Sequence, residues 1–166
     1  MDNAALVVVE PVDAGRVQFL YEPPEEYDFR ISFTIPQEKD CIVQIGYCAG
    51  HQFDYPIGGT RNTFAGFETV DGKEGNNNQT TKKRNHWLTS GHRYTSVVKV
   101  RKSGLEAYLD GELVTRLQTD YSDMNVRGPW RLPRGNVIGI GASDQTVRFD
   151  AVEVIEITGR GKMLTQ

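Results

Sequence analysis

The segment "RYTSVVKVRKSGLEAYLDGELVTRLQ", residues 93–118, decides the fold class of this chain. Asp110-Gly111 is a dipeptide typical of tight β-hairpin turns, and Ser103-Gly104 marks a second turn. Between the turns, apolar residues alternate with polar ones, which is the period of a strand with one buried face. The segment therefore predicts three antiparallel strands, at residues 93–101, 105–110 and 112–118.

The same alternation occurs upstream in "YEPPEEYDFRISFTIP", residues 21–36. Proline has no N–H to donate to a sheet, so Pro23-Pro24 ends one strand. Tyr27 opens the next strand, whose apolar side chains all fall on one face, and the acids around the prolines keep the corner in water. We expect this apolar face to lie in the core, with members Tyr27, Phe29, Ile31, Phe33 and Ile35.

Short strand patterns separated by turns account for most of the remaining chain, and no pattern fits an amphipathic helix of three turns. Further strands are predicted in residues 5–11, 16–22, 41–47, 51–59, 63–72, 136–143 and 146–157. Two long polar or irregular segments interrupt them, at residues 72–85 and 119–135. Many short strands at regular spacing predict an all-β fold, a two-sheet antiparallel jelly-roll sandwich, formed as a single domain by residues 1–166.

Charge and hydropathy argue against two classes of partner. The chain has 166 residues and a formal net charge of −3, so it offers no basic field for nucleic acid or anionic lipid. No apolar run approaches the roughly 20 residues that cross a bilayer. The first residues lack a basic region ahead of their short apolar run, so we expect no signal peptide in this sequence. Neither an oligomeric state nor a compartment follows from these features.

Cys41 and Cys48 lie at the two ends of "CIVQIGYC", taken as one extended strand. Seven residues of strand span roughly 23 Å, and the odd spacing places the two thiols on opposite faces. A disulfide requires Cα atoms within about 7 Å, so both cysteines are expected to be free.

The order of these segments resembles a concanavalin A-like, LamG-like jelly roll. The strand–turn–strand at residues 93–114 resembles that superfamily's hairpin with a "YxDG" turn, and residues 135–157 resemble its closing pair of strands. "YEPPEEYDFRISFTI" and "AGFETVDG" resemble lectin-like domains of unknown function in planctomycete-type multidomain bacterial proteins, and a related sugar-hydrolase-like family. The resemblance covers residues 16–160. It implies a lectin-like module of a larger bacterial protein, outside the cytoplasm, although the superfamily also contains glucanases and plain interaction modules.

Catalysis on a sugar needs two carboxylates facing each other, about 5–9.5 Å apart. The resemblance implies a Glu-x-Asp-x-Glu strand for such an enzyme, and this chain has none. Glu68 and Asp71 flank a turn, Asp150, Glu153 and Glu156 do not share a face, and Asp110 belongs to a turn although it has the parity of Glu106. The sequence leans against an enzyme, but a hydrolase-like domain stays an alternative.

Other ligand chemistries have less support. The glycine-rich "GNVIGIG" precedes no helix, so it is not a phosphate loop. The histidines His51, His86 and His92 are not spaced as metal ligands. The stretch "DGKEGNNNQ", residues 71–79, has oxygen donors that suit a structural calcium ion, from Asp71, Glu74, Asn76 and Asn78, but it also fits a polar loop without an ion.

Sugar binding rests on aromatic rings beside planar polar groups, because a pyranose has an apolar face and a rim of hydroxyls. Four groups of residues fit this pattern: one in "HQFDYPIGGTRN", one at the end of the first long irregular segment, one in the second such segment, and one on the central hairpin. Each ring could instead be a packing residue over a sheet end. We expect a poly- or oligosaccharide on a concave sheet face, walled by the two long segments, with contacts from His51, Tyr55, Arg61, Trp87, Tyr108, Asp110, Arg116 and Trp130.

Overall fold

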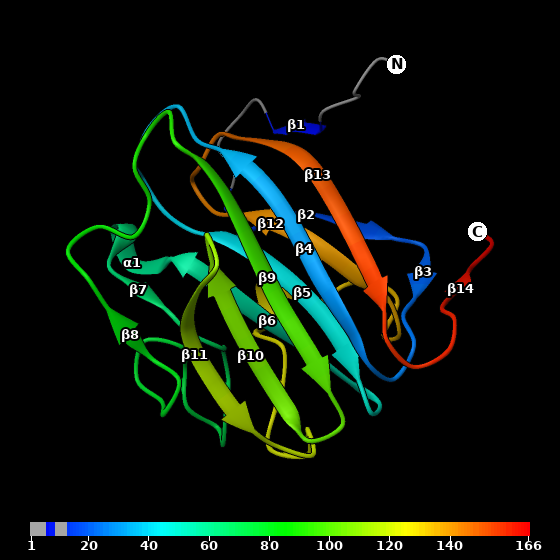
Figure 1. The fold of residues 1–166 in the computed structure, drawn as a ribbon. Coiled ribbons are helices and arrows are strands. Elements are labelled where there is room, and N and C mark those ends of the chain that lie inside the picture. The colour runs from blue at the N-terminus through cyan, green and yellow to red at the C-terminus, as the bar shows by residue number, and fades with distance from the viewer. Residues whose placement is uncertain (1–5, 9–12) are drawn as a thin grey trace.

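The computed structural model describes residues 6–8 and 13–166, which form two six-stranded antiparallel sheets packed face to face (Figure 1). Sheet A contains, in spatial order, β1 (Leu6–Val8), β13 (Val147–Glu156), β4 (Tyr27–Thr34), β9 (Arg93–Arg101), β10 (Gly104–Leu109) and β11 (Glu112–Gln118). Sheet B contains β2 (Gly15–Phe19), β12 (Ile138–Ala142), β5 (Ile42–Cys48), β6 (His51–Gly58), β7 (Phe64–Ala65) and β8 (Lys82–Lys83). A short third pair joins β14 (Lys162–Met163) to β3 (Tyr21–Glu22).

Strand β4 places its apolar side chains in the space between the two sheets, as its alternation predicts. Tyr27, Ile31 and Phe33 are fully buried, and Phe29 and Ile35 are nearly so. The strand lies between β13 and β9, so all its backbone groups have neighbours to pair with. Its outward side chains stay polar, and Arg30 pairs with Glu153 of β13.

The central hairpins at residues 93–118 are confirmed to within one residue. β9 pairs with β10, and β10 pairs with β11. Asp110 and Gly111 have φ of 49° and 82°. Positive φ at both positions belongs to the turn type whose twist matches the flanking strands. A bulge between Ala107 and Tyr108 shifts the register against β11, so that Tyr108 lies opposite Leu113.

Other predictions need correction. The strand expected at residues 63–72 is reduced to β7, although Gly66 N and Glu68 N still donate to carbonyl oxygens of β6. Pro56 explains the loss, because its nitrogen faces β7 and cannot donate to the ladder. Of the strand expected at residues 5–11, the structure describes only β1, and the rest lies outside the described residues.

A second apolar cluster covers the outer face of sheet B, the face turned away from sheet A. Val126, Trp130 and Leu132 of the segment at residues 119–137 pack on Val43 and Ile45 of β5. Four further residues complete this cluster: Cys41, Val137 and the half-buried Ala14 and Leu164. Sheet B is therefore buried on both faces along β5, whereas the segment leaves the outer face of sheet A open.

The two cysteines are free, as predicted, and both are buried. Cys41 belongs to the cluster on the outer face of sheet B, and Cys48 belongs to the core between the sheets. The odd spacing along β5 thus does place the thiols on opposite faces.

Helical structure within the described ranges is limited to the four-residue α1 (Gly59–Asn62) and a 3₁₀ turn, η1 (Gly128–Trp130). Among these residues, no helix is long and apolar enough to cross a bilayer.

Candidate functional site

The outer face of sheet A carries an apolar strip between two polar rows. Register pairs Tyr108 of β10 with Val97 of β9 on one side and with Leu113 of β11 on the other. Tyr108 and Val97 are half-buried and Leu113 is 42 % exposed, so solvent reaches all three. An aromatic ring in a solvent-accessible apolar strip is a surface on which a sugar ring can stack.

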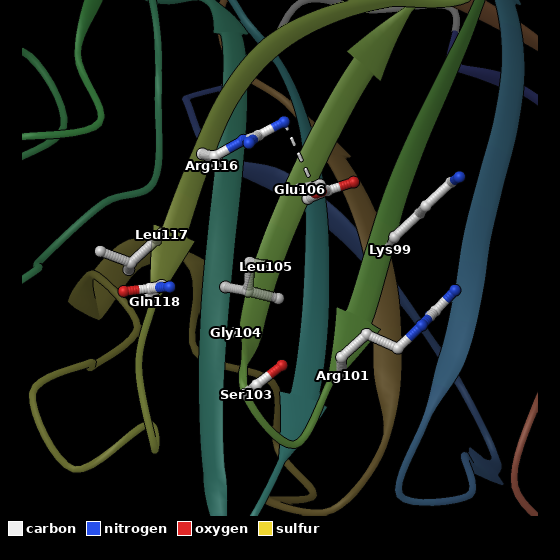
Figure 2. A pocket seen from close by; sticks show the side chains of 9 residues that line it. All are labelled: Lys99, Arg101, Ser103, Gly104, Leu105, Glu106, Arg116, Leu117 and Gln118. Carbon is white, nitrogen blue, oxygen red and sulfur yellow. Dashed lines mark ion pairs between the residues drawn. The ribbon is translucent and has the colours of Figure 1, made fainter.

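Lys99, Glu106 and Arg116 form the first polar row, two residues from the strip on β9 and β10 and three residues from it on the bulged β11. They line a groove of about 390 Å³, and Figure 2 shows their side chains, with that of Arg101, on the outer face of the sheet. This volume lies within the range of small-molecule sites, which is about 300–1,000 Å³. The rest of the groove is lined by Ser103, Gly104, Leu105, Leu117 and Gln118.

Glu106 contacts the side chains of both Tyr108 and Arg116. One of its oxygens accepts a 2.6 Å hydrogen bond from the Tyr108 hydroxyl, and the other lies 3.7 Å from the Arg116 guanidinium. The bond to Glu106, helped by partial desolvation, raises the pKa of Tyr108 above its ordinary value. Tyr108 therefore keeps its proton at neutral pH, and its hydroxyl fixes one Glu106 oxygen while Arg116 stays loosely held.

Arg101 is more firmly held. Its guanidinium donates to the carbonyl oxygens of Tyr27 and Val100, and it forms a 2.8 Å ion pair with Asp28. Three donated hydrogen bonds, one of them to a carboxylate, leave the guanidinium little freedom to turn toward a ligand. Arg101 thus forms a wall of the groove.

The second polar row lies toward the β10–β11 turn. Asp110 accepts a 2.8 Å hydrogen bond from the Thr95 backbone N–H and lies 2.8 Å from Nε2 of His92. Of the predicted site residues, Tyr108, Asp110 and Arg116 are therefore brought together, on β10, its turn and β11. Val97, Lys99 and Leu113 were not predicted. The Asp110-Gly111 turn could have indicated them, because it helps to fix which residues of the neighbouring strands lie beside Tyr108 and Glu106.

Three predicted contacts need correction, because their rings are packing residues. Tyr55 is fully buried and packs 5.0 Å from Phe67, ring centre to ring centre. Trp87 is 5 % exposed beneath the guanidinium of Arg84, which lies 4.1 Å from the ring centre. Trp130 is 3 % exposed on the outer face of sheet B. None of these rings offers a free face for a sugar.

Arg61 and His51 are accessible but lie on sheet B, away from Tyr108. Arg61 is exposed in α1, in a left-handed turn in which Thr60, Arg61 and Asn62 all have positive φ. Asn62 holds this costly conformation by accepting from the N–H groups of Trp87 and Leu88 and donating to the Leu88 carbonyl. His51, at the start of β6, lines a separate hollow beside residues 125–135.

A buried polar cluster that the sequence did not predict anchors the segment covering sheet B. Asp54 of β6 is fully buried, and one of its oxygens accepts the Arg127 backbone N–H at 2.9 Å. Glu68 accepts the N–H of Gly75 at 2.8 Å, and its other oxygen lies 3.9 Å from the Arg127 guanidinium. Burial raises the pKa of both carboxyl groups, that of Asp54 strongly.

Next to this cluster is a cavity of about 220 Å³, bordered by Asp13, Asp40, Glu68 and Trp130 among others. It is smaller than the sites that usually hold sugars or other small ligands. Within the part of the chain that the structure describes, no three His, Cys, Asp or Glu side chains are placed to hold a metal ion. In the loop considered for calcium, Asn78 binds its own loop, donating to the carbonyl oxygens of Phe67 and Glu74.

Comparisons with known proteins support the fold. No family model matches the sequence, and no curated protein sequence matches it. The carbohydrate binding module CBM66 from Bacillus subtilis is similar in structure, with a TM-score of 0.55, 10 % identity and 93 % of each chain covered. The exoplasmic/lumenal domain of VIP36, in a Ca²⁺/Man2-bound form, gives a TM-score of 0.58 at 10 % identity, over 95 % of this chain and 81 % of that one.

A putative glycosyl hydrolase from Parabacteroides distasonis gives a TM-score of 0.57 at 14 % identity, over 95 % of this chain and 88 % of that one. Identities this low show the fold alone. The chain has a concanavalin A-like, lectin-like jelly-roll fold, as the sequence predicted. The narrower resemblance to planctomycete-type domains stays a prediction.

Proposed function

We propose that this protein is a non-catalytic carbohydrate-binding module that binds a poly- or oligosaccharide on the outer face of sheet A, as part of a larger protein. The observation that carries the proposal is the apolar strip of Val97, Tyr108 and Leu113 beside the groove lined by Glu106 and Arg116. A sugar ring stacked on Tyr108 would bring its hydroxyls to that carboxylate and guanidinium. The structural neighbours include a carbohydrate binding module and a domain in a Ca²⁺/Man2-bound form, which supports the same class of ligand.

The hydrolase alternative has weaker support in the geometry. The groove beside Tyr108 is lined by one carboxylate, Glu106, whereas glycoside hydrolysis uses two facing carboxyl groups. The cavity beside Glu68 has several acids but is small, and Trp130 closes part of it. A module without any ligand is opposed by the open, partly aromatic face itself, since an apolar strip set among charged groups is a common feature of binding surfaces.

A glycan array, followed by titration of the best glycan, tests the proposal. Tyr108→Ala should weaken binding by on the order of 1–2 kcal/mol, as loss of an aromatic anchor does, whereas Tyr108→Phe should keep most of the affinity because it keeps the ring. His51→Ala, on sheet B, is the control and should bind as the unmodified protein does. Binding that survives Tyr108→Ala but is lost with His51→Ala would place the site elsewhere, and no binding to any glycan would overturn the proposal.

A further inference from the structure

Lys99 differs from the other cations of the open face. Arg30, Arg101 and Arg116 each form an ion pair with a carboxylate on the neighbouring strand, and Arg93 pairs with Asp150 of β13, two strands away. Among the residues that the structure describes, Lys99 forms no ion pair, and its ammonium group lies over the Tyr108 ring, 4.9 Å from the ring centre. The half-buried lysine thus covers the one aromatic surface on which a sugar would stack.

This position has a consequence for any ligand of the site. A sugar ring can reach the face of Tyr108 only after the ammonium moves aside and loses its contact with the ring electrons. A neutral sugar can replace the lost contact of the ammonium group only with hydrogen bonds to its hydroxyl groups. An anionic sugar offers a full negative charge, and a charge-assisted hydrogen bond is about twice as strong as a neutral one.

The groove supplies a second cation for the same charge. Arg116 is 65 % exposed, and its only ion pair with another described residue, Glu106, is long at 3.7 Å. Lys99 and Arg116 are neighbours of Glu106 in one row across β9, β10 and β11, one on each side of it. Three of the residues that line the groove are cations and one is an acid, and Asp28, beside the groove, neutralises Arg101. One positive charge therefore remains in excess at the groove, although the whole chain has a net charge of −3.

Resting on the proposed function, we propose that the ligand is a uronic-acid-containing glycan, with its sugar ring on Tyr108 and its carboxylate between Lys99 and Arg116. The planar guanidinium of Arg116 can hold a carboxylate through two parallel hydrogen bonds. Lys99 moves from the ring to the carboxylate when the ligand binds. Lys99 is thus a specificity-determining residue that disfavours neutral sugars by covering the ring and favours acidic sugars by pairing with them.

Affinity electrophoresis in native gels tests this inference with a matched pair of polymers, polygalacturonate and its fully methyl-esterified form, which share a backbone and differ in charge. The protein should be retarded by polygalacturonate at least about tenfold more strongly than by the ester. Lys99→Met, which removes the charge but keeps most of the length of the side chain, should lose most of this preference and bind the ester as well as or better than the unmodified protein. Mobility in a polymer-free gel corrects for the altered charge.

Lys102→Met is the control, because it removes the same charge from an exposed lysine at the β9–β10 turn that does not line the groove. It should keep the preference for polygalacturonate. Equal binding of the two polymers, or a preference that survives Lys99→Met, overturns the inference while the glycan array still decides the proposed function. Retardation by dextran sulfate that matches polygalacturonate and is lost equally in both lysine variants would show unspecific polyanion binding and also overturn it.

Discussion

The Trp130 ring lies so close to Gly141 of β12 that a Cβ atom built on this glycine would come within 2.6 Å of the indole. The carbonyl oxygen of Gly15 would be 2.8 Å from the same atom. Gly141 is therefore needed for the close approach of the segment at residues 119–137 to sheet B. This contact also explains why Trp130 is a packing residue, although its sequence context of arginines and prolines predicted a loop aromatic with a free face.

Gly141→Ala should destabilise the protein by about 1–3 kcal/mol, the usual cost of forcing extra volume into a packed interior. Urea denaturation followed by tryptophan fluorescence measures the change. Gly128→Ala is the control, because a Cβ atom there meets nothing within 4 Å, and it should leave stability nearly unchanged. Equal stability of the two variants would mean that Trp130 does not pack on β12 as the structure has it.

Phe33→Ala should cost roughly 3–5 kcal/mol, as truncation of a buried aromatic side chain does. The Phe33 ring is fully buried and stacks on Tyr94 at 5.6 Å between ring centres, with Phe149 at 6.3 Å on another side. The neighbouring Thr34 faces outward from the same strand, so Thr34→Ala should cost far less. A loss below about 1 kcal/mol for Phe33→Ala in denaturant melts would contradict the register of β4.

Both cysteines should be inert to a thiol reagent in the native protein and titrate as two thiols once it is denatured without reductant. Burial raises the pKa of the Cys41 and Cys48 thiols, and the reactive species is the thiolate. The measurement is the time course of the reaction between the protein's thiols and the reagent at pH 8, with and without urea. Rapid reaction of either thiol in the native state would show that its side of β5 opens readily.

The fold was predictable because its signals are local. The alternation of residues 27–35, the Asp110-Gly111 turn and the odd spacing of Cys41 and Cys48 each act through strand geometry, which is the same in any sheet. The site was only half predictable. Tyr108, Asp110 and Arg116 belong to one hairpin, and the sequence brought them together. Exposure of Trp87 and Trp130 depends on long-range packing under Arg84 and over Gly141, which no local pattern contains.

The buried carboxyl group of Asp54 should make stability fall as pH rises from acid toward neutral. One of its oxygens accepts the Arg127 N–H, and the other has no hydrogen-bond partner in the structure. Burial, with a smaller contribution from the charge of Glu68, raises the pKa of Asp54 well above its ordinary value. In the unfolded chain the same group titrates near pH 4.

Between these two pKa values, the folded protein binds more protons than the unfolded chain, so the free energy of unfolding decreases with increasing pH and levels off above the folded pKa. Glu68 and Asp40, whose pKa values are also raised by burial, add to the same slope.

Asp54→Asn removes the carboxyl group whose pKa is raised most strongly by burial, but it keeps an oxygen that can accept the Arg127 N–H. Urea melts between pH 4.5 and 8 should therefore show a flatter pH dependence for Asp54→Asn than for the unmodified protein. The control is Asp120→Asn, at an exposed aspartate whose pKa is lowered by hydrogen bonds from Ser122, because that group is ionised in both states across this range. A slope that is unchanged by Asp54→Asn, or stability that rises with pH over the window, would show that the Asp54 carboxyl group is not buried as the structure places it.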